Sequence, residues 1–162
     1  MKLQITSAVL ILASWVIVQG KPLQQAFDKT AFYAVMESGD VEAIDKQIKL
    51  VQGSLIPAKE AYEGTLLMKK SGFLKKLKEK LAVFKSGHGK LEACIKKDNG
   101  NAELRFLRIM IQEHAPGVVK YRGNLEEDKE QIKRSFKSLP PDIQRFILAY
   151  SSQSKVLDAK DF

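Results

Sequence analysis

The sequence predicts an all-α protein of about seven helices that pack as successive antiparallel hairpins, with no sheet. Apolar residues recur three and four positions apart through most of the chain, which is the spacing of one face of a helix. The breaks between these runs carry Gly, Pro, Asn or Asp, residues that end helices or begin them. Connections of only a few residues favour antiparallel neighbours, in a bundle or a repeat-like helical array.

The first three helices are predicted from apolar spacing and from the residues at their ends. Gly39 suits a left-handed position after the first helix, and Asp40 can cap the second. Pro57 opens the third helix, which ends near Lys69 and Lys70, whose charges complement the C-terminal end of the helix dipole. The apolar faces are Leu23, Phe27, Ala31 and Ala34; Val41, Ile44, Ile48 and Val51; and Ala58, Ala61, Tyr62, Thr65 and Leu66.

Four more helices follow. Gly87 and Gly89 each cost the fourth helix about 1 kcal/mol relative to Ala, so they are candidate positions for a bend or a break. Asn101 caps the fifth helix, which is expected to be buried on a wide face. The sixth lies within residues 124–137 and is expected to begin with Asn124 as its cap, with acids at its start and bases at its end. The remaining apolar stripes are Leu77, Leu81, Phe84, His88, Leu91 and Ile95; Leu104, Phe106, Leu107, Met110 and Ile111; and Ile143, Phe146, Ile147 and Tyr150.

Residues 1–20 are predicted to be a secretory signal peptide that is cleaved after Gly20. Lys2 precedes an uncharged apolar run, Leu3 to Val18, which is shorter than the about 20 residues of a membrane span. The alternative is that the segment is retained as an anchor. Residues 21–162 are then expected to form a single exported helical domain, periplasmic or extracellular. The absence of any Asn-x-Ser/Thr glycosylation site favours a bacterial origin.

Two segments carry resemblances. The segment KLEACIKKDNGNAELRFL, residues 90–107, resembles the junction between tetratricopeptide repeats, although the full repeat does not recur about 34 residues away. The longer segment from AYEGTLLMKKSGF to RFLRIMIQEHAPGVVKY, residues 61–121, is similar to a family of small exported bacterial proteins, of the Bacteroidetes type, that has no assigned activity. This second resemblance implies export and supplies no activity.

The sequence contains no pattern typical of a catalytic or metal site. Cys94, the only cysteine, lies beside an apolar stripe, where a thiol usually behaves as a small hydrophobic group. His114 lies about one helix length further from the turn, which disfavours a Cys-His pair. Zinc requires three or four clustered ligands, and His88 and His114 are the only histidines. We therefore expect no enzyme activity, no metal and no cofactor.

The charge of the chain is positive, with 27 Lys and Arg against 19 Asp and Glu, and the excess is concentrated between residues 58 and 100. One interpretation is contact with anionic lipid or polysaccharide. The favoured interpretation is that the apolar side, Leu74, Leu77, Leu81 and Phe84, belongs to the core and that the lysines are its solvated back. Nucleic acid is not expected as a partner, because no recognition module is present. The lysines of this basic segment are Lys69, Lys70, Lys75, Lys76, Lys78, Lys80 and Lys85.

Arg105, Arg108 and Gln112 share one face of the fifth helix, since they recur three and seven positions apart. They are candidates for lining a partner-binding groove. The favoured alternative is that they pair internally with the acids of residues 124–128. The function expected from the sequence is an exported, non-catalytic module that binds an unidentified protein or peptide. The alternative function is an envelope or adhesion protein that contacts anionic lipid or polysaccharide through residues 69–85.

Overall fold

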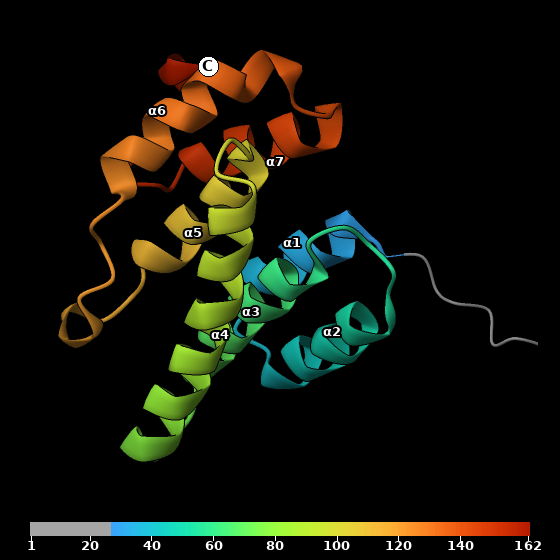
Figure 1. Ribbon diagram of the computed structural model, residues 1–162, viewed down its shortest axis with the longest axis vertical. Helices are drawn as coiled ribbons and strands as arrows, with labels where there is room; N and C mark the ends of the chain where they lie inside the picture. The colour runs from blue at the N-terminus through green and yellow to red at the C-terminus, as the bar shows by residue number, and fades with distance from the viewer. Residues whose placement is uncertain (1–26) are drawn as a thin grey trace, which may run out of the picture.

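The computed structural model describes residues 27–162, and within this range it contains seven α-helices and no strand (Figure 1). The prediction of an all-α protein of seven helices is confirmed. The predicted signal peptide and its cleavage after Gly20 lie outside the described residues. No helix between residues 27 and 162 combines the length and the apolar character needed to cross a bilayer. The helices are α1 (Lys29–Glu37), α2 (Val41–Gly53), α3 (Lys59–Ser71), α4 (Leu77–Lys97), α5 (Ala102–Gln112), α6 (Leu125–Ser135) and α7 (Pro141–Ser151), with short 3-10 helices η1 (Gly117–Val119), η2 (Phe136–Ser138) and η3 (Ala159–Asp161).

Two helices begin with the caps that the sequence predicts. The carboxylate of Asp40 accepts hydrogen bonds from the backbone N–H groups of Glu42 and Ala43 at the start of α2. The side chain of Asn101 accepts a hydrogen bond from the backbone N–H of Leu104 at the start of α5. These bonds satisfy N–H groups that have no partner within a helix, so each cap fixes the residue at which its helix begins.

Three details of the helix ends differ from prediction. Gly39 is not left-handed, and within residues 27–162 the positive φ angles belong to Ala58, at 53°, and Lys120, at 49°. The left-handed Ala58 is the N-cap of α3, so this helix begins after it and not at Pro57. Asn124 precedes α6 but makes no capping hydrogen bond with its side chain. At α3 the left-handed backbone of Ala58, and not a side-chain cap, sets where the helix begins.

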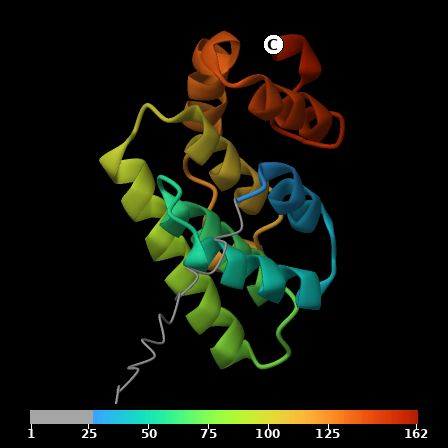
Figure 2. The same ribbon diagram turned by 90° about the vertical axis from the view of Figure 1, so that its right-hand side faces the viewer.

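Helix α5 lies at the centre of the molecule. Ten of its eleven residues are buried, which confirms the expected wide buried face. Figure 2 shows α6 and α7 together at one end of the molecule, with α2, α3 and α4 toward the other and α5 between them. All seven helices contribute side chains to one apolar core. The core therefore depends on α5, whose faces contact both groups of helices.

The carboxylate of Glu103 connects the start of α5 to two other helices. It accepts a hydrogen bond from Lys29 of α1 at 2.7 Å and another from Tyr62 of α3 at 2.7 Å. Tyr33 of α1 donates a third, longer hydrogen bond at 3.3 Å. One partly buried acid thus has three donors, and hydrogen bonds to a charged group stabilise a fold more than neutral ones.

Helices α3 and α4 form the most extensive helix pair, an antiparallel hairpin that crosses at two glycines. A Cβ atom on either Gly64 or Gly87 would lie within 3.0 Å of the carbonyl oxygen of the other. Only glycine permits backbones to approach this closely. Helix α4 runs without a break from Leu77 to Lys97, through both Gly87 and Gly89. The cost of Gly87 inside a helix is therefore offset by close packing against α3.

Candidate binding site

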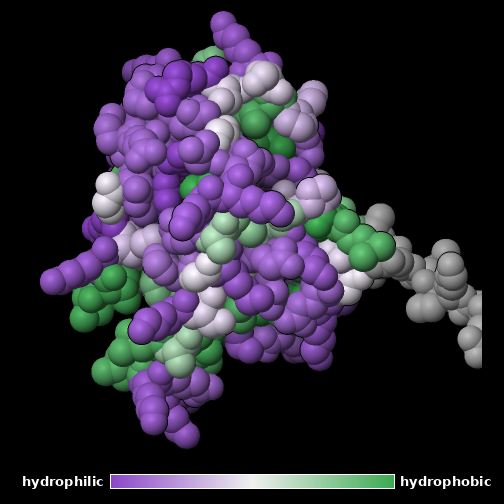
Figure 3. Space-filling view, in the orientation of Figure 1, coloured by the Kyte–Doolittle hydropathy of each residue, from purple (hydrophilic) through white to green (hydrophobic). Residues whose placement is uncertain are grey.

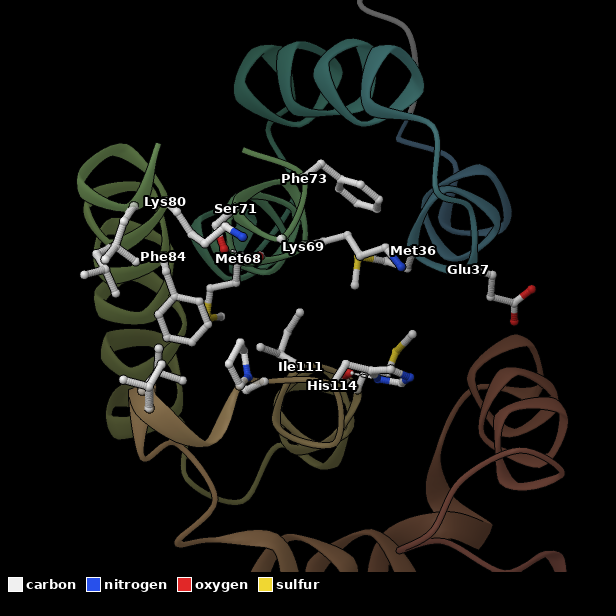
Figure 4. Close-up of a pocket in the computed structure, with 18 of the residues that line it drawn as sticks. Met36, Glu37, Met68, Lys69, Ser71, Phe73, Lys80, Phe84, Ile111 and His114 are labelled. Carbon is white, nitrogen blue, oxygen red and sulfur yellow. Dashed lines mark hydrogen bonds between the residues drawn. The ribbon is translucent and has the colours of Figure 1, made fainter. Parts of the chain in front are cut away.

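A pocket of about 430 Å³ opens where five helices meet. The last residues of α1, α3, α5 and α7, the first turns of α4, and η1 surround it (Figure 4). Pockets of this volume hold small ligands or a cluster of apolar side chains from a partner. The apolar residues in the lining are Met36, Met68, Phe73, Leu77, Leu81, Phe84, Met110, Ile111, Ala115, Pro116, Val118 and Val119.

Three methionines from three helices contribute to the wall of this pocket. Met36, Met68 and Met110 lie near the ends of α1, α3 and α5. Apart from Met1, these are the only methionines of the chain. Methionine is unbranched and polarizable, so it adapts its shape to different apolar partners. The wall of the pocket is therefore suited to apolar groups of different shapes.

The outer rim of the pocket is apolar and exposed. The exposed fractions are 43% for Phe73, 67% for Leu77, 44% for Leu81 and 79% for Val118. Figure 3 shows apolar atoms gathered over the lower end of α4 and over the loop between α5 and α6, with hydrophilic atoms around them. Contiguous exposed apolar surface rimmed by polar residues is typical of an interaction site.

The exposure of Leu77 and Leu81 corrects a sequence prediction. Both were expected in the core, as part of an apolar side with solvated lysines behind it. Burial along α4 begins only at Gly87 and continues at Leu91 and Ile95. The first turns of α4 extend past the helices that cover its later turns, so the prediction is wrong for these two residues. Phe84 is half-buried, and it lines the pocket.

Two lysines of the basic segment, Lys69 and Lys80, line the pocket. Neither ammonium has an ion-pair or hydrogen-bond partner among residues 27–162. Burial lowers the pKa of Lys69, an effect that the charge of nearby Glu37 opposes. Figure 4 shows the Lys69 side chain crossing one side of the cavity toward Met36 and Glu37. The pocket thus combines an apolar wall with two cationic groups that lack a bonded partner in this part of the chain.

The other lysines of the basic segment are placed differently. Lys70 forms an ion pair with Asp45 of α2 at 2.6 Å and so helps to join α2 to α3. Four more lysines are exposed to solvent on or near the first turns of α4. They flank the exposed apolar rim, and they give this end of the molecule a positive charge. The four are Lys75, Lys76, Lys78 and Lys85.

Arg105 and Arg108 are buried and bind Asp128 of α6, which is fully buried. Arg108 donates two hydrogen bonds of 2.6 Å to the two carboxylate oxygens, and Arg105 donates one of 2.8 Å. Arg105 also binds Glu127 at 2.7 Å, and Arg108 also binds Glu92 at 2.8 Å. These ion pairs agree with the internal alternative. The side chains lie inside the molecule, between α4, α5 and α6, and not on an open groove.

Gln112 is also fully buried, and neither polar atom of its amide has a hydrogen-bond partner among the described residues. A buried polar group without a partner costs about 1 to 3 kcal/mol. The replacement Gln112→Met keeps the shape of the side chain and removes both polar atoms. We therefore expect it to raise the free energy of unfolding by about 1 to 3 kcal/mol, measured by urea denaturation.

The matched control for this prediction is Gln144→Met. The amide nitrogen of Gln144 donates a hydrogen bond of 2.8 Å to the backbone carbonyl of Leu139, so its loss should not stabilise the fold. If the two replacements change the free energy of unfolding equally, the amide of Gln112 contributes as much as a hydrogen-bonded amide does, and the prediction is contradicted.

Cys94 lies against the first turn of α3, where burial raises the pKa of its thiol and the charge of Glu60 adds to this effect. A backbone hydrogen bond with Ala61 and two nearby lysines act in the opposite direction. A raised pKa disfavours the thiolate that nucleophilic chemistry needs. His114 contributes to the pocket and hydrogen-bonds to the backbone of Met110, and the ring of His88 packs edge to face against Tyr121. Residues 27–162 contain no group of three His, Cys, Asp or Glu that could hold a metal.

The sequence did not indicate the pocket, because its residues come from segments that meet only in the folded chain. None of the family models, curated proteins and solved structures compared with the chain matches it. The resemblances to a tetratricopeptide junction and to a family of exported bacterial proteins remain predictions. The chemistry of the pocket therefore has to be argued from its own residues. By its fold and its pocket, the protein belongs to the class of helical proteins with an apolar surface pocket. Methionines line this pocket, and lysines border it.

Proposed function

We propose that the protein is a non-catalytic binding module that holds an apolar segment of another protein or peptide in this pocket. The observation that carries the proposal is the exposed apolar rim, Phe73, Leu77, Leu81 and Val118, which continues into a methionine-lined cavity. Exposing this surface to water is costly, and covering it is favourable at roughly 25 cal/mol per Å². The binding residues proposed here replace Arg105, Arg108 and Gln112, whose side chains are buried.

Photo-crosslinking tests the proposal directly. With p-benzoyl-phenylalanine in place of Leu81, we expect irradiation in the host cell to give one discrete protein adduct. The matched control is the same substitution at Leu148 on α7, because the two leucines are similarly exposed, at 44% and 41%, and Leu148 is not in the pocket lining. The change Leu77→Asp should abolish the adduct at position 81, since a buried unpaired carboxylate is costly. Equal labelling at both positions would contradict the proposal.

A second candidate function, contact with an anionic membrane surface or polysaccharide, is supported by the lysines that surround the same rim. Lys75, Lys76 and Lys78 are exposed beside Leu77, as in a helix that lies on a lipid surface. If this function is the correct one, the protein should sediment with phosphatidylglycerol vesicles at low salt. The sedimentation should be lost at high salt and in Lys75→Glu with Lys76→Glu, and photo-adducts should form with lipid and not with protein.

A further inference from the structure

Three apolar residues of α4, of which two are exposed and Phe84 is half-buried, form a row that fits a helix. Leu77, Leu81 and Phe84 are four and three positions apart, so they lie on one face of α4 and span about 10 Å along its axis. A row of this length corresponds to about two turns of a second helix packed against it. Binding an amphipathic helix in an apolar groove is a common mode of peptide recognition. The methionines behind the row suit such a partner, because they adapt to its side chains.

The charges around the pocket decide which amphipathic helix fits. Glu37 is the only acid in the lining, against Lys69 and Lys80. Lys69 is half-buried among apolar side chains, and its ammonium has no bonded partner among residues 27–162. A cation in such a place gains a charge-assisted hydrogen bond when a carboxylate enters. A basic partner would instead be repelled by these lysines and by those at the start of α4.

We propose that the bound segment is an amphipathic helix of a partner protein with Asp or Glu beside its apolar face, and that Lys69 binds one of those carboxylates. This inference rests on the proposed function of the pocket. The apolar row supplies most of the affinity, and Lys69 selects an acid at one position of the bound helix. Lys80, on the neighbouring helix, extends the same preference toward the rim.

Selection from a displayed library of random 16-residue peptides tests this inference on the purified protein. Wild-type protein should enrich peptides with apolar residues three and four positions apart and with Asp or Glu beside them. Lys69→Gln should keep the apolar preference and lose the acidic one. The matched control is Lys96→Gln, which changes an exposed lysine at the other end of α4, outside the pocket lining, and should select the same peptides as wild type.

Affinities of one selected peptide complete the test. Lys69→Gln should weaken binding about tenfold, and changing the selected Glu of the peptide to Gln should weaken binding to wild type by a similar factor. The two changes together should weaken it no further than either alone. Thermal unfolding followed by circular dichroism checks that each variant is folded.

The outcomes separate this inference from the proposed function. Apolar peptides without acids would overturn the role of Lys69 while the proposed function stands. No enrichment of apolar peptides would overturn both. A dimer in analytical ultracentrifugation that Leu77→Asp dissociates would show that a second copy of the chain occupies the groove, and would overturn the inference. Binding to phosphatidylglycerol vesicles in place of peptides would also overturn it.

Discussion

Asp128→Ala is expected to lower the free energy of unfolding by about 3 to 5 kcal/mol, because it leaves buried guanidinium groups without their shared partner. Asp128 is 0% exposed and receives three hydrogen bonds from Arg105 and Arg108. Arg108 would keep only Glu92, and Arg105 only Glu127 and a backbone carbonyl. Urea denaturation of the variant and the wild type measures the difference.

The matched control is the neighbouring acid, Glu127, which binds the same arginine but whose side chain is 63% exposed. Glu127→Ala should leave the denaturation midpoint nearly unchanged, since water screens an exposed ion pair. A double variant, Asp128→Leu with Arg108→Leu, should recover part of the loss, because apolar side chains can replace a buried ion pair. Equal, small effects at the two acids would contradict the buried network.

Gly87→Ala is expected to lower the free energy of unfolding by about 1 to 3 kcal/mol, although alanine favours a helix over glycine by about 1 kcal/mol. The added methyl group would meet the backbone carbonyl of Gly64 within 3.0 Å, so α3 and α4 would have to separate. In the same helix, a Cβ on Gly89 meets no atom within 4 Å. Gly89→Ala should therefore stabilise the fold by about 0.5 to 1 kcal/mol.

The opposite signs of these two glycine variants are the decisive result, and thermal or urea denaturation gives both. If Gly87→Ala and Gly89→Ala were equally stabilising, the close crossing of α3 and α4 would be wrong. Far-ultraviolet circular dichroism should show the same helix content in both variants, since α4 continues through both positions.

Much of the fold could be predicted because its signals are local. The caps at Asp40 and Asn101 depend on residues within one turn of each helix, and the wide apolar face of α5 lies within eleven residues. The cost of Gly87 was visible for the same reason. Its benefit was not, because Gly64 belongs to another helix and nothing near it in sequence indicates that the two backbones meet.

The candidate site could not be predicted, because an apolar stripe shows which face of a helix is apolar but not whether another helix covers it. Leu91 and Leu77 belong to the same stripe, yet Leu91 is buried and Leu77 is not. Likewise, Lys69 and Lys70 are adjacent, but Lys70 pairs with Asp45 of α2 while Lys69 lines the pocket. These differences arise from contacts between helices that are distant in sequence.

The uneven burial along α4 has a consequence for motion. Its later turns are held in the core through Leu91 and Ile95, whereas its first turns expose much of Leu77 and Leu81. Segments with few buried apolar contacts open locally at far lower free energy than the whole molecule unfolds. We therefore expect this wall of the binding pocket to open locally without unfolding of the whole molecule, so that the pocket can admit ligands of different sizes.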